Sequence, residues 1–113
     1  MEIVWSDMSL RQVDENLDYV EEHFGAFVAQ ETLDKINAKV NDLLDFPESG
    51  TPDFSYTSKV ALDDILIRHI KVGPNVIYYN VVGDIINIMV IAHYRQSPQT
   101  VISMIKRYYE GIS

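Results

Sequence analysis

The sequence predicts an α+β fold, in which an N-terminal strand and a two-helix hairpin pack on an antiparallel β-sheet and a short helix closes the chain. Three observations support this fold class. Apolar residues recur at steps of three and four within residues 10–43, which is the spacing of one helix face. Residues 65–95 are rich in β-branched and aromatic side chains, as strands are. The pair Gly83-Asp84 divides this run into two long segments, which should pair as antiparallel neighbours.

The first half of the chain is expected to form one strand and a helical hairpin. Residues 2–5 form a short strand candidate, and Ser6 or Asp7 can cap the helix that follows, because both side chains accept hydrogen bonds from free backbone amides. The apolar stripes are Leu10, Val13, Leu17, Val20 and Phe24, then Ala29, Leu33, Ile36, Val40 and Leu43. Gly25 separates the two helices, and the second should end before Pro47.

Turn formers and caps mark the remaining connections. Residues 46–52 are dense in such residues, and we expect a loop that runs on to about Ser58 before the first strand of the sheet. Ser97 can cap a last helix, and Pro98 is a favoured first helical residue. This helix should end near Tyr109.

Alternation along the two long strands assigns side chains to two faces. With Val82 set opposite Ile85, one face is almost wholly apolar: Ile77, Tyr79, Val81, Ile86, Ile88 and Val90. The other face is mixed and leads to His93 and Arg95: Val76, Tyr78, Asn80, Val82, Ile85, Asn87, Met89 and Ile91. Two interpretations of the mixed face stay open. It is a half-buried layer under the C-terminal helix, or a groove for an extended or helical peptide.

Length and composition indicate a single domain over residues 1–113, because 47% hydrophobic residues are ample for one packed core. The chain has no cysteine, no charged-then-apolar leader and no apolar run near the ~18 residues of a membrane span. We therefore expect a soluble cytoplasmic protein. The three histidines, His23, His69 and His93, lack ligand spacing, so neither a metal nor a cofactor is expected.

Charge is distributed unevenly along the chain. Residues 1–64 hold 15 acidic and 4 basic residues, a net of −11, whereas residues 65–113 hold 2 acidic and 5 basic residues, a net of +3. An anionic partner should therefore prefer the sheet side. The alternative is that acidic helices keep the protein soluble while the strands carry few charges.

Several short sequence words, in a fixed order, resemble one known family over nearly the whole chain. These are Ile3-Val4-Trp5-Ser6, Leu10, Tyr19-Val20, Phe46-Pro47-Glu48-Ser49-Gly50-Thr51-Pro52, Arg68, Val72-Gly73, Tyr79 and His93. Their order and spacing resemble the RelE/ParE superfamily of toxin–antitoxin toxins, and within it the ParE branch, often labelled plasmid stabilisation proteins. The chain departs from the family pattern at Pro74-Asn75, in place of a basic-aromatic pair, and at Gln96, in place of an arginine.

The resemblance implies a toxin that inhibits DNA gyrase and is neutralised by a cognate antitoxin. Arg68, His93 and Arg95 are then the candidates for target binding. The candidates for antitoxin binding lie on the mixed face: Tyr78, Asn80, Asn87, Met89 and Ile91. One alternative is a RelE-like endoribonuclease that cleaves mRNA, either at the ribosome or free of it, with Arg68, His93, Arg95 and Tyr108 as catalytic candidates. Another is a non-toxic relative that still binds antitoxin, and a homodimer is left open.

Overall fold

The computed structural model, which describes residues 1–111, is an α+β domain. In chain order the elements are β1 (Glu2–Trp5), α1 (Asp7–Phe24), α2 (Ala26–Asn41), the 3-10 turn η1 (Asp42–Leu44), β2 (Thr51–Pro52), α3 (Phe54–Val60), β3 (Arg68–Val72), β4 (Asn75–Val82), β5 (Ile85–His93) and α4 (Pro98–Tyr109). The predicted fold class is confirmed. The expected loop to about Ser58 is wrong in part, because this stretch contains β2 and begins α3.

Local capping agrees with the sequence. Ser6 precedes α1 and its hydroxyl accepts a hydrogen bond from the Ser9 amide at 3.0 Å. Ser97 does the same for α4, accepting from the Thr100 amide at 3.2 Å. Each cap satisfies a helical amide that would otherwise lack a partner. Gly25 ends α1 with a backbone φ of 92°, a conformation that glycine adopts at little cost.

The sheet has five strands in the order β1-β5-β4-β3-β2 within residues 1–111. Its predicted antiparallel core is confirmed, including the register that places Val82 opposite Ile85. β1 instead runs parallel to β5, with Ile3 opposite Ile86. A parallel neighbour requires a long crossover connection, and the whole of the intervening chain provides one. The sheet is therefore mixed.

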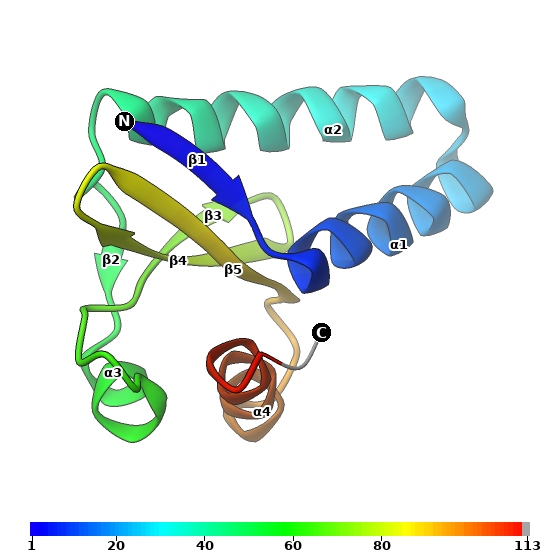
Figure 1. Ribbon diagram of the computed structural model, residues 1–113. Coiled ribbons are helices and arrows are strands. Elements are labelled where there is room, and N and C mark those ends of the chain that lie inside the picture. Colours follow the sequence, from blue (N-terminus) through cyan, green and yellow to red (C-terminus); the bar gives the residue numbers. More distant parts are fainter. Residues whose placement is uncertain (112–113) are drawn as a thin grey trace.

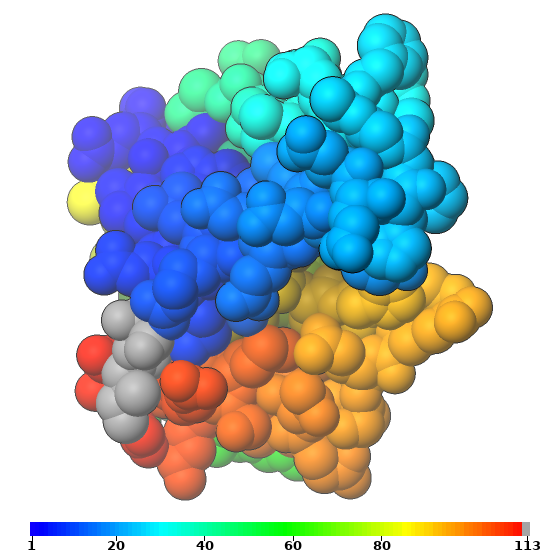
Figure 2. Space-filling view, turned by 90° about the vertical axis from the view of Figure 1, so that its right-hand side faces the viewer, coloured from blue at the N-terminus to red at the C-terminus, as the bar shows by residue number. Residues whose placement is uncertain are grey.

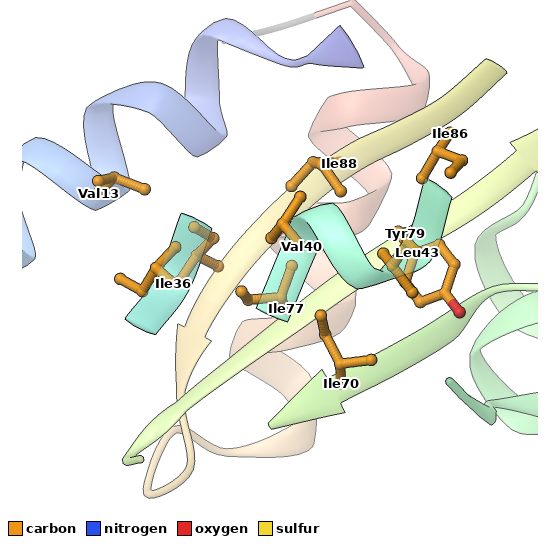
Figure 3. Packing of buried hydrophobic residues seen from close by; sticks show 10 residues of the cluster. Val13, Ile36, Val40, Leu43, Ile70, Ile77, Tyr79, Ile86 and Ile88 are labelled. Carbon is orange, nitrogen blue, oxygen red and sulfur yellow. The ribbon is translucent and has the colours of Figure 1, made fainter. Parts of the chain in front are cut away.

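Helices cover both faces of the sheet (Figure 1). On one face the α1–α2 hairpin buries Val13, Ile36 and Val40, and η1 buries Leu43, against β3, β4 and β5. Figure 3 shows these side chains converging on strand residues such as Ile77 and Ile88. On the other face α3 and α4 cover a second cluster, with members that include Tyr78, Met89, Val101 and Ile105. The domain thus has two apolar layers separated by one sheet.

A β-bulge at Met89 overturns part of the predicted face assignment. Tyr78 pairs with Val90 and Tyr79 pairs with Ile88, so the register skips Met89. One extra residue inverts the alternation beyond it. Val90 therefore packs under α4, and Ile91 packs with the hairpin core. The predictions that Val90 belongs to the apolar face and Ile91 to the mixed face are wrong for this reason.

Candidate functional site

Arg68, the first predicted site residue, holds a loop in place. Its guanidinium Nη1 donates hydrogen bonds to the carbonyl oxygens of Glu48 and Gly50, each at 3.0 Å. From the neighbouring strand, the Tyr79 hydroxyl donates to the Pro47 carbonyl at 2.8 Å and accepts from the Gly50 amide at 2.9 Å. Side chains from β3 and β4 therefore clamp residues 47–50 onto the sheet. We call this arrangement the loop clamp.

The structure does not bring Arg68 together with His93. Arg68 pairs with Tyr79, whereas His93 pairs with Asn75, four residues away along β4. Arg68 and His93 also lie on strands that flank β4 on opposite sides. From the rise along a strand and the spacing between strands, their Cα atoms are roughly 17 Å apart. The predicted target-binding residues therefore do not form one cluster: β3 and β5 run in the same direction, and Arg68 begins β3 whereas His93 ends β5.

His93, Tyr94 and Arg95 form an ordered, exposed stack just after β5. The rings of His93 and Tyr94 lie 4.7 Å apart, with 29° between their planes. The Arg95 guanidinium carbon is 5.4 Å from the centre of the Tyr94 ring, and its Nε donates to the Tyr94 hydroxyl at 2.9 Å. The Arg95 amide also donates to His93 Nδ1 at 3.1 Å. These contacts preset a cation and two aromatic faces for a partner.

A cavity of about 240 Å³ lies next to this stack, between α1, β5 and α4. Its lining comprises Gln12, Glu15, Asn16, Asn75, Ile91, Ala92, His93, Gln96 and Met104. Asn75 and Gln96, which depart from the family pattern, therefore meet in one place. Asn75 is only 4% exposed, and its Nδ2 donates to Asn16 Oδ1 at 3.5 Å, a long hydrogen bond. Carboxamides both donate and accept hydrogen bonds, and Glu15 adds a carboxylate to the lining, so this cavity suits a polar group that can donate hydrogen bonds.

Sequence reasoning missed the contribution of α1 to this cavity. Gln12 and Asn16 are four residues apart, so they share one face of α1. The Gln12 side-chain oxygen accepts a hydrogen bond from the Ile91 amide at 2.7 Å. That spacing beside the apolar stripe was the available signal. It could not indicate the partner, since Ile91 is 79 residues away.

The residues predicted to bind an antitoxin lie mostly inside the fold. Tyr78 and Met89 are buried beneath α3 and α4, and Ile91 faces the α1–α2 hairpin. Asn80 is 1% exposed. Its amide donates to the Tyr109 hydroxyl at 3.2 Å, and its oxygen accepts from Asn87 at 2.9 Å. Of the two interpretations of the mixed face, the layer under the C-terminal helix is the correct one. Asn87 alone remains half-exposed.

Burial perturbs the tyrosines in this layer. Loss of solvent raises the pKa of Tyr109 to about 12, and nearby Asp63 adds to the shift, while the hydrogen bond from Asn80 opposes it. Burial also raises the pKa of Tyr108, again with help from Asp63. For Tyr78, burial is the main cause of a raised pKa, followed by Tyr56 and Asp53. Ionising these hydroxyls would place charges where the surrounding side chains limit contact with water.

Stability should therefore fall in alkaline solution. The pKa of Tyr109 is higher in the folded than in the unfolded chain, so its contribution is fully present below pH 10 and is lost as the pH rises through about 12. We expect the thermal midpoint to drop across this window, and to drop less in the Tyr109→Phe variant. The measurement is thermal unfolding by circular dichroism from pH 8 to pH 12. Parallel curves for the two proteins would contradict this role of Tyr109.

Within residues 1–111 no group of three or more His, Cys, Asp or Glu side chains is placed to hold a metal ion. None of the helices there is both long and apolar enough to cross a bilayer.

Comparisons with known proteins agree with this architecture. Residues 3–98 match the model of a family described as the ParE toxin of the type II toxin–antitoxin system parDE. A chain from the solved chromosomal ParDE toxin–antitoxin system of P. aeruginosa is similar in structure, with a TM-score of 0.65 and 20% sequence identity. The similarity covers 82% of the present chain and 95% of the other. None of the curated proteins matches the sequence.

Proposed function

Because this chain belongs to the ParE toxin family of type II toxin–antitoxin systems, we propose that it arrests growth by inhibiting DNA gyrase and that a cognate antitoxin neutralises it. The family match over residues 3–98 is the observation that carries the proposal. The sequence resembles the ParE branch, which is known for gyrase poisons. Gyrase acts in the cytoplasm, and we expect this protein there.

The geometry supports a binding mechanism over RNA cleavage. Cleavage through a 2′-hydroxyl needs a base and several cations around one phosphate. Here the Arg68 guanidinium donates its hydrogen bonds to the backbone carbonyls of the loop clamp. Arg68 begins β3, whereas His93 ends β5, at the opposite end of the sheet. Tyr108 is partly buried in the layer under α4. The four catalytic candidates of the ribonuclease alternative therefore do not surround one phosphate.

We assign target binding to the stack of His93, Tyr94 and Arg95. All three side chains are exposed, and they lie in the more basic half of the sequence. A planar guanidinium pre-oriented on an aromatic ring is suited to carboxylate or phosphate groups. The proposed target surface does not include Arg68, because its guanidinium already donates hydrogen bonds to two carbonyls of its own chain.

For the antitoxin we propose the corner of the mixed face that α4 leaves uncovered. Val82 pairs with Ile85, and Val4 pairs with Asn87, so these four side chains share one face. Val4, Val82 and Ile85 are exposed, and Asn87 is half-exposed. Exposed β-branched residues beside a polar amide are suited to a partner that buries them. Among the residues first predicted for this role, only Asn87 is accessible.

Target identity can be tested with purified components. The protein should inhibit supercoiling by DNA gyrase and accumulate cleaved DNA complexes. A ribonuclease would instead leave gyrase untouched and produce codon-linked breaks in translated messages, seen by primer extension. Absence of growth arrest together with tight antitoxin binding would identify a non-toxic relative.

Arg95→Ala should relieve growth arrest without unfolding the protein. Loss of an exposed arginine changes stability by no more than about 0.5 kcal/mol, whereas loss of a charge-assisted contact to a target costs on the order of 1.5–3 kcal/mol. We therefore expect gyrase inhibition to weaken roughly 10- to 100-fold. Arg11→Ala, which removes an exposed arginine from α1, is the matched control and should stay toxic. Equal toxicity of both variants would place the target surface elsewhere.

A further inference from the structure

Aromatic side chains gather on the surface where α1 ends and α2 begins. Tyr19, Phe24 and Phe27 are 56%, 63% and 79% exposed. The Tyr19 ring stacks on His23 at 4.1 Å, and the His23 ring lies 6.3 Å from that of Phe24. We call Tyr19, His23, Phe24 and Phe27 the aromatic tip. Figure 2 looks at this side of the molecule, where the light-blue turn between the helices lies on the surface.

Packing within the domain does not explain these residues. Phe24 continues the predicted apolar stripe of α1, yet the cluster under the hairpin includes Val13 and Leu17 and does not extend to Phe24. An 18-residue helix is about 27 Å long, and the end of this hairpin projects beyond the strands (Figure 1). Large apolar side chains exposed together usually mark a surface that a partner covers.

The charge around the tip indicates the chemistry of that partner. Residues 14–34 contain seven acidic residues and neither lysine nor arginine. Such a surface repels DNA, RNA and anionic lipid. It attracts cationic side chains, which aromatic faces hold by cation–π contact and carboxylates hold by charge-assisted hydrogen bonds. Both kinds of group are present within one turn of helix, as Glu21 and Glu22 directly precede His23 and Phe24.

We propose that the aromatic tip is a docking surface for an arginine-containing basic protein segment. The surface shares no residue with the stack of His93, Tyr94 and Arg95, and the proposal does not rest on gyrase as the target. Aromatic stacking of Tyr19 on His23, fixed by the 2.9 Å contact between His23 Nδ1 and the Tyr19 carbonyl, presents a flat platform. Arginine is favoured over lysine because its planar guanidinium stacks on rings and pairs with carboxylates.

The probe is a fluorescein-labelled peptide of alternating arginine and glycine, with binding followed by fluorescence anisotropy. The double variant Phe24→Ser/Phe27→Ser keeps every formal charge but removes two rings, and it should bind at least 10-fold more weakly. Phe46→Ser/Phe54→Ser is the matched control, because these residues are 68% and 70% exposed on other elements. It should bind as the unmodified protein does. A peptide of alternating lysine and glycine should bind the unmodified protein more weakly than the arginine–glycine peptide does.

Several outcomes would overturn the proposal. Equal affinity of the tip variant and the unmodified protein would mean that the peptide detects charge alone. A dimer in analytical ultracentrifugation that Phe24→Ser/Phe27→Ser abolishes would make a second copy the occupant. Co-sedimentation with phosphatidylcholine–phosphatidylglycerol vesicles would make it a lipid surface. If the variant fails to fold, the test is the change in amide NMR chemical shifts of the unmodified protein when the peptide is added. The proposal requires these changes to centre on residues 19–27, and changes centred elsewhere would overturn it.

Discussion

Gly50→Ala should destabilise the protein by about 3 kcal/mol, which is at the upper end for overpacking in a folded domain. A Cβ built at this position would lie 2.5 Å from the Tyr79 hydroxyl, 2.6 Å from its ring and 2.9 Å from the His69 carbonyl. Tyr79 is fully buried and cannot move aside. The added methyl group would also disrupt the hydrogen bond from the Gly50 amide. Thermal unfolding should show a midpoint lower by roughly 10 °C.

Gly83→Ala is the control for backbone effects. Gly83 has a φ of 59°, and its Cβ would meet nothing within 4 Å, so only conformational strain of about 1 kcal/mol is expected. Tyr79→Phe then tests the same clamp from the other side. It removes the hydroxyl that bonds both Gly50 and Pro47 and should cost about 1–3 kcal/mol. If the Gly50→Ala protein were as stable as the Gly83→Ala protein, the loop clamp would be able to shift and accept a methyl group without loss of stability.

Arg68→Ala should lower stability by about 2 kcal/mol. Its two bonds to backbone carbonyls are charge-assisted, and such bonds contribute more than neutral ones. Loss of the guanidinium frees the Glu48 and Gly50 carbonyls and releases the loop. Urea denaturation followed by tryptophan fluorescence or circular dichroism measures the change.

Arg68→Lys refines this test. A lysine can reach one carbonyl but cannot bridge two in a fixed plane, so it should recover about half of the lost stability. Arg95→Ala, from the exposed stack, should stay within about 0.5 kcal/mol of the unmodified protein. If instead Arg68→Ala and Arg95→Ala were equally stable, the loop clamp would have no energetic role.

The elements that the sequence predicted well are those with strong local signals. Ser6 and Ser97 are caps, Gly83-Asp84 closes a hairpin, and the apolar stripes follow helical spacing, so each depends on residues near in sequence. β2 was missed because two residues leave no periodicity to detect. α3 was missed because the turn formers before it dominated the interpretation of that segment.

The site was harder to predict because it depends on distant pairings. The bulge at Met89 has no glycine to mark it, yet it decides which face Ile91 occupies. Arg68 begins β3 whereas His93 ends β5, and these two strands run in the same direction, so the two residues lie far apart although both belong to one β-rich run. Asn75 and Gln96 were each noticed as departures, but only the tertiary structure shows that they share a cavity.

The bulge at Met89 also bears on how such a domain can evolve. Deletion of a single residue there would restore regular alternation in β5, and residues beyond it would exchange faces. His93 would then point to the α4 side, away from Gln12 and Asn16. A one-codon loss could thus redirect the end of this strand from one side of the domain to the other while leaving the β4–β5 turn unchanged. Length variation within β5, as well as substitution, is therefore a route by which relatives could acquire a different partner.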